Sequence, residues 1–317
     1  MKIRISALAH ALAVAALALY VVASAIGKPQ SLHVSLIEGT GAQLGPVLLQ
    51  LDSFRVEQDA DGAVKDYVSE ITVQGSEGGC LHTVSVGHPA VSGDWRFYQS
   101  DWGVTESGET YSTLLCVRDP LVPVKAAGLW MLLCAGLMMI AGAAAGMSGR
   151  GGRTALWAVP LCVAFAIVFT WTVLSGVGVG RRSLPPVLRS PWFVPHLAAY
   201  MLAYAAMATA TVLGFVSLKR AEVAGALRTA VRAGFGLLTC GLVLGALWAG
   251  QAWGSFWSWD PKESWALATW IAYAAYLHLP RRKWTLAVLV AAFLLLQMCW
   301  WGVSLLPSAS SSMHLYS

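Results

Sequence analysis

Long, uninterrupted apolar segments constrain this chain more than any other feature of its sequence. A helix needs about 20 apolar residues to cross a hydrocarbon layer of about 30 Å. Seven segments approach or exceed that length: residues 5–26, 124–146, 154–177, 195–217, 231–251, 264–280 and 284–306. Of the 317 residues 57% are hydrophobic and only 12% are charged, about half the charged share of a soluble domain. We therefore predict an all-α polytopic membrane protein with about seven transmembrane helices.

Basic residues divide unevenly between the two sides of these predicted helices. Eleven Lys and Arg lie on the side of the N-terminus, and four lie in the short loops of the opposite side. Cytoplasmic loops carry the excess of basic residues, so the N-terminus and the loops near residues 150, 225 and 282 are expected in the cytoplasm. The net charge of +5 then indicates contact with membrane lipid rather than with nucleic acid. We predict a multi-pass protein of the bacterial inner membrane, with segment 27–122, loop 252–263 and the C-terminus on the outer, periplasmic side.

The first apolar segment has two interpretations. Lys2 and Arg4, the apolar run and Ala23-Ser24-Ala25 together resemble a cleavable signal peptide. The run of about 20 residues is longer than a usual signal core of 7–15 residues. This length favours a retained N-terminal transmembrane anchor at residues 1–26.

The one long polar segment, residues 27–122, follows this anchor. Apolar and polar residues alternate over parts of it, such as Ser69–Val73, and Asp59–Gly62 supplies a turn between two such runs. These patterns predict a small extracytoplasmic β domain. Cys80 and Cys116 both lie in it, and whether they form a disulfide outside the cytoplasm is left open.

Tryptophan is concentrated in one place. The chain has 15 Trp, and six of them fall within the 23 residues 248–270. An interfacial belt of Trp would be spread over many helix ends, which this cluster is not. Gly254 and Pro261 suit a shaped loop, and Asp260 is a plausible N-cap for the following helix. The aromatic planes of such a loop would stack on a large, flat, apolar ligand at the outer face.

The loop Trp253–Trp265, with the sequence WGSFWSWDPKESW, resembles the WWD signature of haem-handling proteins that assemble cytochromes c. The segments Trp270–His278 and Leu184–His196 are similar to the CcsA, or ResC, branch of that superfamily, and Arg96–Trp102, preceded by His88-Pro89, is similar to its partner CcsB, or ResB. The chain thus resembles a short fusion of the two halves of a system II cytochrome c synthase. The resemblance divides it into the anchor 1–26, a ResB-like β domain 27–122, and a CcsA/ResC-like haem-handling membrane domain 123–317 with its WWD loop at 252–265.

Histidine is the expected axial ligand of such a haem. The family assigns its two outer ligands to positions that correspond to His196 and His314, which share the predicted side of the Trp loop. An ionisable residue within a span indicates function. His278 matches the family motif for an inner haem site, and His10 is assigned to that site by its depth in the first span. For each of the four, the alternative is an ordinary interfacial histidine at a helix end.

The remaining expectations follow from the resemblance. Trp253, Trp257, Trp259, Asp260 and Trp265 are expected to contact haem b, which is both ligand and substrate, although Asp260 also fits a simple helix cap. Arg181, Arg182 and Arg189 either anchor their loop or neutralise the haem propionates. No residue stands out as a general acid or base, so the catalytic residues remain unassigned.

The implied function is haem handling and covalent attachment of haem to the CxxCH thiols of apocytochrome c, a holocytochrome c synthase activity of the haem lyase type. A thiol-reducing protein is an implied partner. The ResB-like part is short, so the need for a further CcsB/ResB-type subunit is left open. The alternatives are a haem exporter or chaperone that makes no thioether, and a b-type electron-transfer cytochrome.

Overall fold

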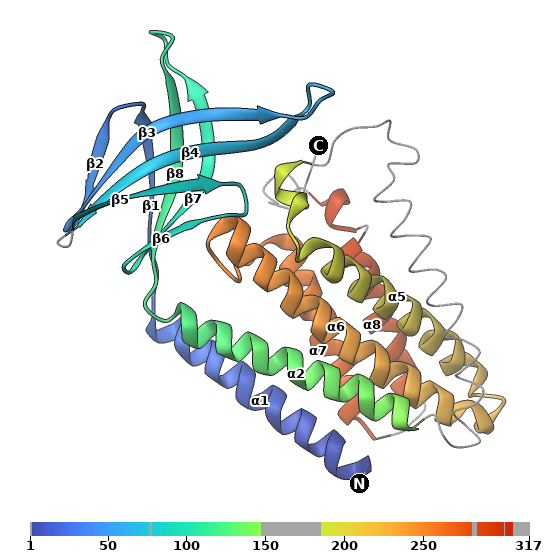
Figure 1. Ribbon diagram of the computed structural model, residues 1–317. Coiled ribbons are helices and arrows are strands. Elements are labelled where there is room, and N and C mark those ends of the chain that lie inside the picture. Colours follow the sequence, from blue (N-terminus) through green and yellow to red (C-terminus); the bar gives the residue numbers. More distant parts are fainter. Residues whose placement is uncertain (1, 76–77, 147–184, 281–283, 301, 307–317) are drawn as a thin grey trace.

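The structure is a computed structural model, and it describes residues 2–75, 78–146, 185–280, 284–300 and 302–306. These residues form a bundle of helices with a β domain at one end of it (Figure 1). The helices are α1 (Lys2–Ile26), α2 (Val122–Gly146), α5 (Phe193–Val216), α6 (Ala224–Trp253), α7 (Pro261–His278) and α8 (Thr285–Trp300). Three short 3-10 turns accompany them: η1 (Pro186–Arg189), η2 (Ala221–Val223) and η3 (Gly302–Leu305).

Six of the seven apolar segments coincide with these helices, and segment 154–177 lies outside the described residues. Four of the described helices are long and apolar enough to cross a membrane: α1, α2, α5, and α6 together with the turn η2 that precedes it. Helix α8 is also apolar but is shorter. Helix α6 begins at Ala224, seven residues before the predicted span, so little loop is left near residue 225. The sequence there, AGALRTAVRAG, is rich in Ala, the best helix former.

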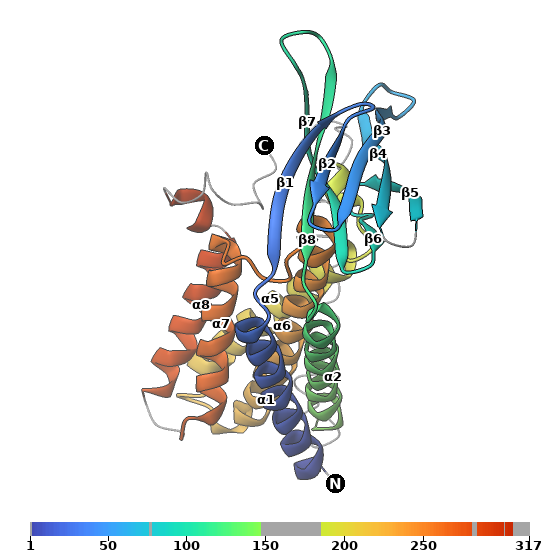
Figure 2. The same cartoon turned by 90° about the vertical axis from the view of Figure 1, so that its left-hand side faces the viewer.

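Small residues let the helices approach one another closely. A Cβ atom on Gly128 of α2 would lie 3.1 Å from the Ala16 carbonyl oxygen of α1. On the same helix, a Cβ atom on Gly136 would lie 3.1 Å from the Gly236 carbonyl oxygen of α6. Close backbone approach at small residues is the usual way that apolar helices associate in lipid. Helix α2 therefore joins α1 to α6, α6 packs on α5, and α7 pairs with α8 (Figure 2).

The β domain lies between α1 and α2 in the sequence, as predicted, and is built from two four-stranded antiparallel sheets. One sheet has the order β1 (Gln30–Ile37), β8 (Thr110–Arg118), β7 (Trp95–Val104) and β6 (Ala90–Ser92). The other has the order β2 (Gly41–Leu44), β3 (Val47–Gln58), β4 (Val64–Gly75) and β5 (Gly78–Ser85). Alternate side chains of both sheets, such as Leu51, Ile71 and Phe97, form one buried core.

The two cysteines of this domain are free thiols. Cys80 is exposed on β5 of one sheet and Cys116 is buried on β8 of the other, so the pairing that the sequence left open is not formed. Burial raises the pKa of the Cys116 thiol to about 12, because an apolar surrounding disfavours the thiolate. Cys116 is thus an unreactive core residue.

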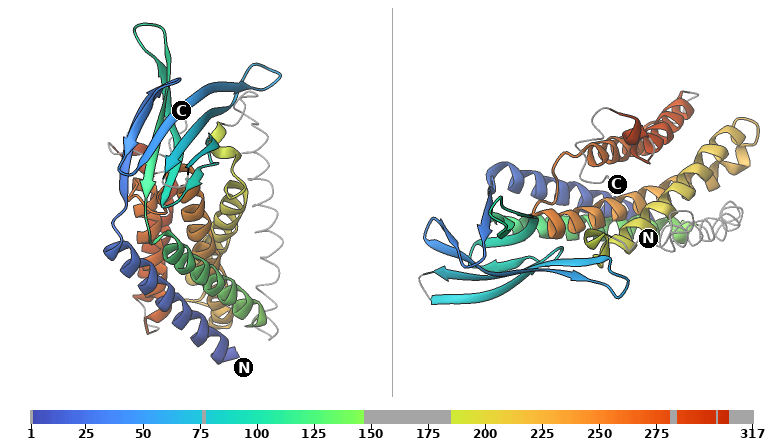
Figure 3. Two further views of the ribbon diagram at one scale, coloured as in Figure 1. Left: turned by 60° about the vertical axis from the view of Figure 1, so that its left-hand side comes forward. Right: turned by 90° about the horizontal axis from the view of Figure 1, so that it is seen from above.

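The β domain is fixed to the helical bundle by specific contacts. Lys125 of α2 donates to Asp119, just after β8, at 2.6 Å and to the Gly27 carbonyl at 3.1 Å. Arg189 of η1 donates to Asp59 of the β domain at 2.7 Å. As a result, the domain lies over the ends of α1, α2 and α6 rather than over α7 and α8 (Figures 2 and 3).

Candidate functional site

The Trp loop begins where α6 ends, on the side of the β domain. Gly254 ends the helix in the left-handed conformation, with φ of +74°, which glycine adopts at little cost. A Cβ atom there would lie 3.1 Å from both Tyr98 and Val117 of the β domain. The loop therefore turns directly beneath the β domain, and glycine is needed for the turn and for the close approach.

The far end of the loop is fixed by a capping box at the start of α7. The Asp260 carboxylate accepts from Lys262 N at 2.8 Å, and the Glu263 carboxylate accepts from Asp260 N at 3.2 Å and from Ser258 N at 2.8 Å. Pro261 occupies the first helical turn, where its missing N–H costs nothing. Asp260, which is 5% exposed, has the helix-cap role that was one of its two sequence interpretations.

Between these two ends, the backbone is held in an unusual conformation. Trp259 has φ of +61° and is the one non-glycine residue with positive φ among the described residues. Such a conformation costs on the order of 1–3 kcal/mol and tends to occur at functional sites. The Trp259 side chain is 70% exposed, and its ring lies edge-on to that of Trp257 with centroids 5.9 Å apart.

A cavity of about 400 Å³ opens on the inner side of this loop, between α5, α6, α7 and the end of α8. That volume lies within the range of small-molecule and cofactor sites. Seven of its 17 lining residues are Phe, Tyr or Trp, among them Tyr200, Tyr204, Trp248, Phe256, Trp257 and Trp300. Its charged lining residues are Lys262 and Glu263, and the Glu263 carboxylate is engaged by the loop backbone. The cavity is suited to a flat, mainly apolar ligand.

His196 supplies the imidazole of this cavity. It lies in the first turn of α5, and its Nδ1 is 2.9 Å from the Gly241 carbonyl oxygen of α6. Because a carbonyl only accepts, this contact assigns the proton to Nδ1 and the lone pair of the neutral ring to Nε2. Metal-binding histidines commonly donate their other ring N–H to a backbone carbonyl in this way. The ring is held between Tyr200 and Trp248, with centroids 5.0 and 5.9 Å away.

Two further imidazoles lie at the opposite end of α7. The rings of His10 and His278 are edge-on, with centroids 5.5 Å apart. His278 Nδ1 is 2.7 Å from the Ala274 carbonyl oxygen one turn earlier. His278 follows Lys262, at the cavity, by 16 positions along α7, which corresponds to about 24 Å along a helix. The structure thus brings His10, which was assigned by depth alone, together with His278, which was assigned by the family motif and by depth.

The predicted haem contacts are divided between different surfaces. Trp257 lines the His196 cavity, whereas Trp253 lines a separate cleft beneath the β domain. Trp259 is exposed, and neither it nor Trp265 is among the described residues that line the cavity. His314, Arg181 and Arg182 lie outside the described residues. Arg189 is paired with Asp59, whose carboxylate raises the pKa of the guanidinium.

Sequence reasoning missed the aromatic residues that complete the cavity. Tyr200 and Tyr204 follow His196 at intervals of four, so all three share one face of α5. This spacing was a usable signal. Trp248 belongs to the Trp cluster 248–270, but its place in the cavity wall could not be predicted, because it depends on a hydrogen bond of 3.1 Å from its Nε1 to the Val187 carbonyl, 61 residues away. In the part of the chain that the structure describes, His, Cys, Asp and Glu form no cluster of three or more that would hold a bare metal ion.

Known protein families match almost the whole chain. Residues 124–310 match the family described as cytochrome c assembly protein, and residues 21–128 match the ResB-like family. Similar proteins include the cytochrome c biogenesis protein CcsA of Synechococcus sp. (strain CC9902), 33% identical over 46% of this chain and 61% of that protein. The protein of the same name from Prochlorococcus marinus (strain MIT 9303) is 36% identical over 46% of this chain and 60% of that protein. The chain therefore spans about 60% of the length of the curated relatives it matches.

Proposed function

We propose that this chain attaches haem covalently to apocytochrome c at the outer membrane face. It belongs to the family of cytochrome c assembly proteins, and it is an integral membrane protein with a ResB-like region ahead of its CcsA-like part. The observation that carries this proposal is the aromatic cavity beside the Trp loop, with the imidazole of His196 in its wall. The proposal includes a topology of seven spans and the domains 1–26, 27–122 and 123–317. It also includes an anchor that is retained, and a β domain, Trp loop and C-terminus that face the periplasm of a bacterium.

The outer site is proposed to bind haem b between two histidines. Its lining fits such a ligand, because large aromatic rings suit the faces of the macrocycle and an imidazole with its lone pair on Nε2 suits the iron. His196 would be one axial ligand and His314 the other. Trp257 contacts the ligand directly in this account, and Trp253, Trp259, Asp260 and Trp265 hold the loop and its entrance in shape.

The inner site is proposed to receive haem first, from the cytoplasmic side. The contact between His10 and His278, with centroids 5.5 Å apart, supports it because two axial ligands of one iron must reach the same point. Haem would then move along α7 to the outer site. This direction of transfer follows from the proposed orientation of the chain.

The attachment itself is an addition that needs no net oxidation. A thiol of the apocytochrome CxxCH segment adds across a haem vinyl group, so that an S–H and a C=C π bond are lost and a C–S and a C–H bond are formed. The thiolate is the reactive form, and a thiol-reducing protein is the proposed partner that keeps both cysteines reduced. The chain contributes position: holding vinyl and thiol together replaces an encounter in solution.

Co-expression tests this proposal. The full chain and an apocytochrome c are produced in a bacterial strain that lacks its own assembly system, and covalent haem is measured by the pyridine adduct. We expect covalent cytochrome with the wild type, at least tenfold less with His196→Ala, and near wild-type yield with Arg118→Met, a control whose exposed ion pair lies outside both cavities. Haem bound to the chain without covalent product would identify an exporter or chaperone, or show that a further CcsB/ResB-type subunit is required. Tightly bound haem with no effect on cytochrome assembly would favour a b-type electron carrier.

A further inference from the structure

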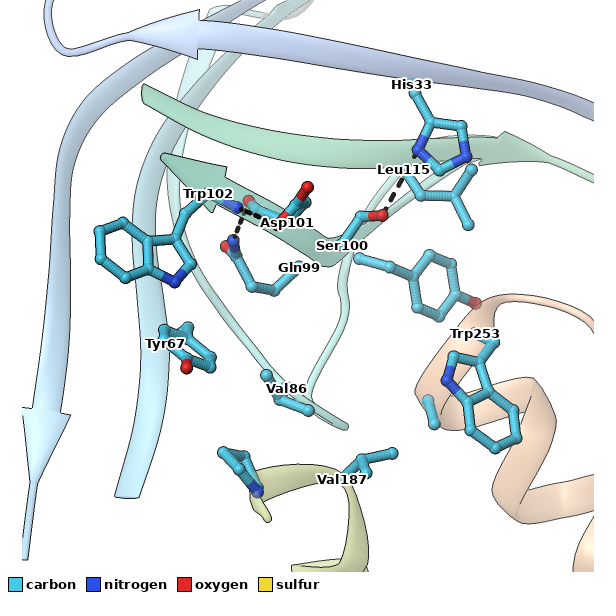
Figure 4. Close-up of a pocket in the computed structure, with 13 residues that line it drawn as sticks. His33, Tyr67, Val86, Gln99, Ser100, Asp101, Trp102, Leu115, Val187 and Trp253 are labelled. Atoms are coloured by element: carbon cyan, nitrogen blue, oxygen red, sulfur yellow. Dashed lines mark hydrogen bonds between the residues drawn. The ribbon is translucent and has the colours of Figure 1, made fainter. Parts of the chain in front are cut away.

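A second cavity, of about 460 Å³, lies between the β domain and the helical bundle (Figure 4). Its walls come from β1, β4, β7 and β8, from Val86 just after β5, from η1, and from the end of α6. It shares no lining residue with the His196 cavity. The mechanism proposed above gives it no role.

The cleft runs along the edge of strand β7. Five successive residues, Tyr98–Trp102, line it. Successive side chains of a strand point to opposite faces, so five in a row line a cleft only where the cleft follows the strand's edge. On the edge that faces away from β8, β6 pairs with Trp95–Phe97 only, and no described strand pairs with this edge beyond Phe97. An unpaired edge of this kind is a template for a further strand.

The open edge is satisfied by its own side chains. The Asp101 carboxylate accepts from Trp102 N at 2.8 Å, and Gln99 Nε2 donates to the Asp101 carbonyl at 3.0 Å. Ser100 is the extra residue of a β-bulge, since Gln99 and Asp101 pair with the neighbours Leu114 and Thr113 on β8. An added strand would bind these two backbone groups in place of the exposed Asp101 carboxylate and the buried Gln99 amide.

Aromatic rings form the outer part of the cleft. Trp102 and Tyr67 both line the cleft, and their ring centroids are 6.0 Å apart. Trp102 also stacks on Phe54, with ring centroids 5.6 Å apart. At the other end, Trp253 lines the cleft, and its ring is 5.3 Å from Trp248. Trp248 in turn lines the His196 cavity. Two adjacent indole rings therefore connect the cleft to the proposed haem site.

The charge of the β domain indicates what kind of chain it would bind. Segment 27–122 has 13 acidic and 5 basic side chains, although the whole protein has a net charge of +5. The cleft itself contains Asp101 and no Lys or Arg among its described lining residues. A field of this sign attracts a cationic polypeptide and disfavours an acidic one.

We propose that the cleft binds an extended, basic segment of apocytochrome c as an added strand along Tyr98–Trp102, and thereby holds its thiols beside the haem cavity. The inference rests on the proposed function, which supplies the identity of the polypeptide. The open edge supplies the main-chain hydrogen bonds, the acidic domain favours the approach, and the Trp253–Trp248 contact sets the direction in which the thiols must lie.

Backbone methylation of the ligand tests the added strand without altering the protein. The purified full chain is titrated with a fluorescent, Lys-flanked peptide carrying the CxxCH segment with both cysteines replaced by Ser. Two further peptides carry N-methyl groups on alternate residues, one on the odd and one on the even positions. Only one set of N–H groups faces a neighbouring strand, so we expect one peptide to bind at least tenfold more weakly and the other to bind like the parent. Equal binding of all three peptides, or none by the parent, overturns the proposal.

Site-directed disulfide exchange tests the position. The chain offers a control in Cys80, which is exposed on β5, the edge strand of the other sheet. A peptide with one cysteine activated as a 2-pyridyl disulfide is expected to react at least tenfold faster with the variant Ser100→Cys, Cys80→Ser than with Cys80 of the wild type. Equal rates, or a disulfide between two copies through position 100, overturn the proposal.

Haem content separates failure of this inference from failure of the proposed function. If the wild type binds haem and matures the cytochrome, but the peptides show no preference for β7, only the cleft assignment is wrong. If the wild type binds no haem, the proposed function fails whatever the peptides do.

Discussion

Replacing Lys125 by Met should destabilise the protein more than any single change on the surface of the β domain. The Lys125 ammonium is 2.6 Å from the Asp119 carboxylate, and both side chains are 7% exposed. It also donates to the Gly27 carbonyl at 3.1 Å. Lys125 lies in the first turn of α2, Asp119 just after β8 and Gly27 just after α1, so this one cation joins the β domain to two of the helices that carry it.

The magnitude follows from the burial of the pair. Removing one partner of a buried ion pair costs about 3–5 kcal/mol, because the other charge is left buried and uncompensated. Arg118 and Asp94 form an ion pair nearby at 2.9 Å, but their side chains are 44% and 61% exposed. An exposed pair contributes at most about 1 kcal/mol. Arg118→Met is therefore a matched control for Lys125→Met.

The assay is denaturant unfolding of the purified protein in detergent, followed by tryptophan fluorescence. We expect Lys125→Met to lower the free energy of unfolding by about 3–5 kcal/mol and Arg118→Met by about 1 kcal/mol or less. The double variant Lys125→Met, Asp119→Asn removes the orphaned charge and should recover at least half of the loss. Equal effects of the two single variants, or no recovery in the double variant, would refute the reasoning.

Three further predictions concern the site and the β domain. In Gly245→Ala the new Cβ would lie 2.7 Å from Cε1 of His196, so the imidazole ring must shift. The purified variant should retain several-fold less haem than the wild type and unfold near the wild-type denaturant midpoint. Unchanged haem content would contradict the His196 assignment. The Tyr273 hydroxyl is buried and has no hydrogen-bond partner within the described residues. Tyr273→Phe should therefore leave the free energy of unfolding unchanged or raise it by about 1 kcal/mol. A clearly lower denaturant midpoint would count against this prediction. A hydrogen bond from Arg189 lowers the pKa of the Asp59 carboxyl in the folded protein. The contact therefore stabilises the fold at pH values above the pKa of about 4 that Asp59 has in the unfolded chain, and this stabilisation is lost as the pH falls through the lower pKa of the folded protein. Asp59→Asn should therefore flatten the pH dependence of unfolding below about pH 4, and an unchanged slope would show that the contact is absent.

The helices and the inner histidine pair were accessible from the sequence because each depends on position along one axis. Continuous apolar runs predict helices, and a residue's distance from the run's end predicts its depth. His10 and His278 are 268 positions apart in the chain, yet the family motif at His278 and the matching depth of His10 grouped them, and their rings lie 5.5 Å apart. Alternation and turn residues likewise predicted the β domain between α1 and α2.

The division of the tryptophans was not accessible in this way. Trp253 and Trp257 lie four residues apart, but Gly254 turns the chain between them, and they line different cavities. Which cavity each one lines depends on how closely the β domain approaches the loop. That approach depends on contacts distant in sequence, such as Arg189 with Asp59 and Lys125 with the Gly27 carbonyl. The open edge of β7 is hidden for the same reason, because an edge is defined by the absence of a partner strand.

The central claim is that haem binds first at His10 and His278 and then beside His196. The most direct measurement is the haem content and absorption spectrum of the purified full chain, compared among the wild type, His278→Ala and His196→Ala. The account predicts that His278→Ala empties both sites, whereas His196→Ala retains haem at the inner site and loses the outer component of the spectrum. Full haem content and an unchanged spectrum in both variants would contradict it.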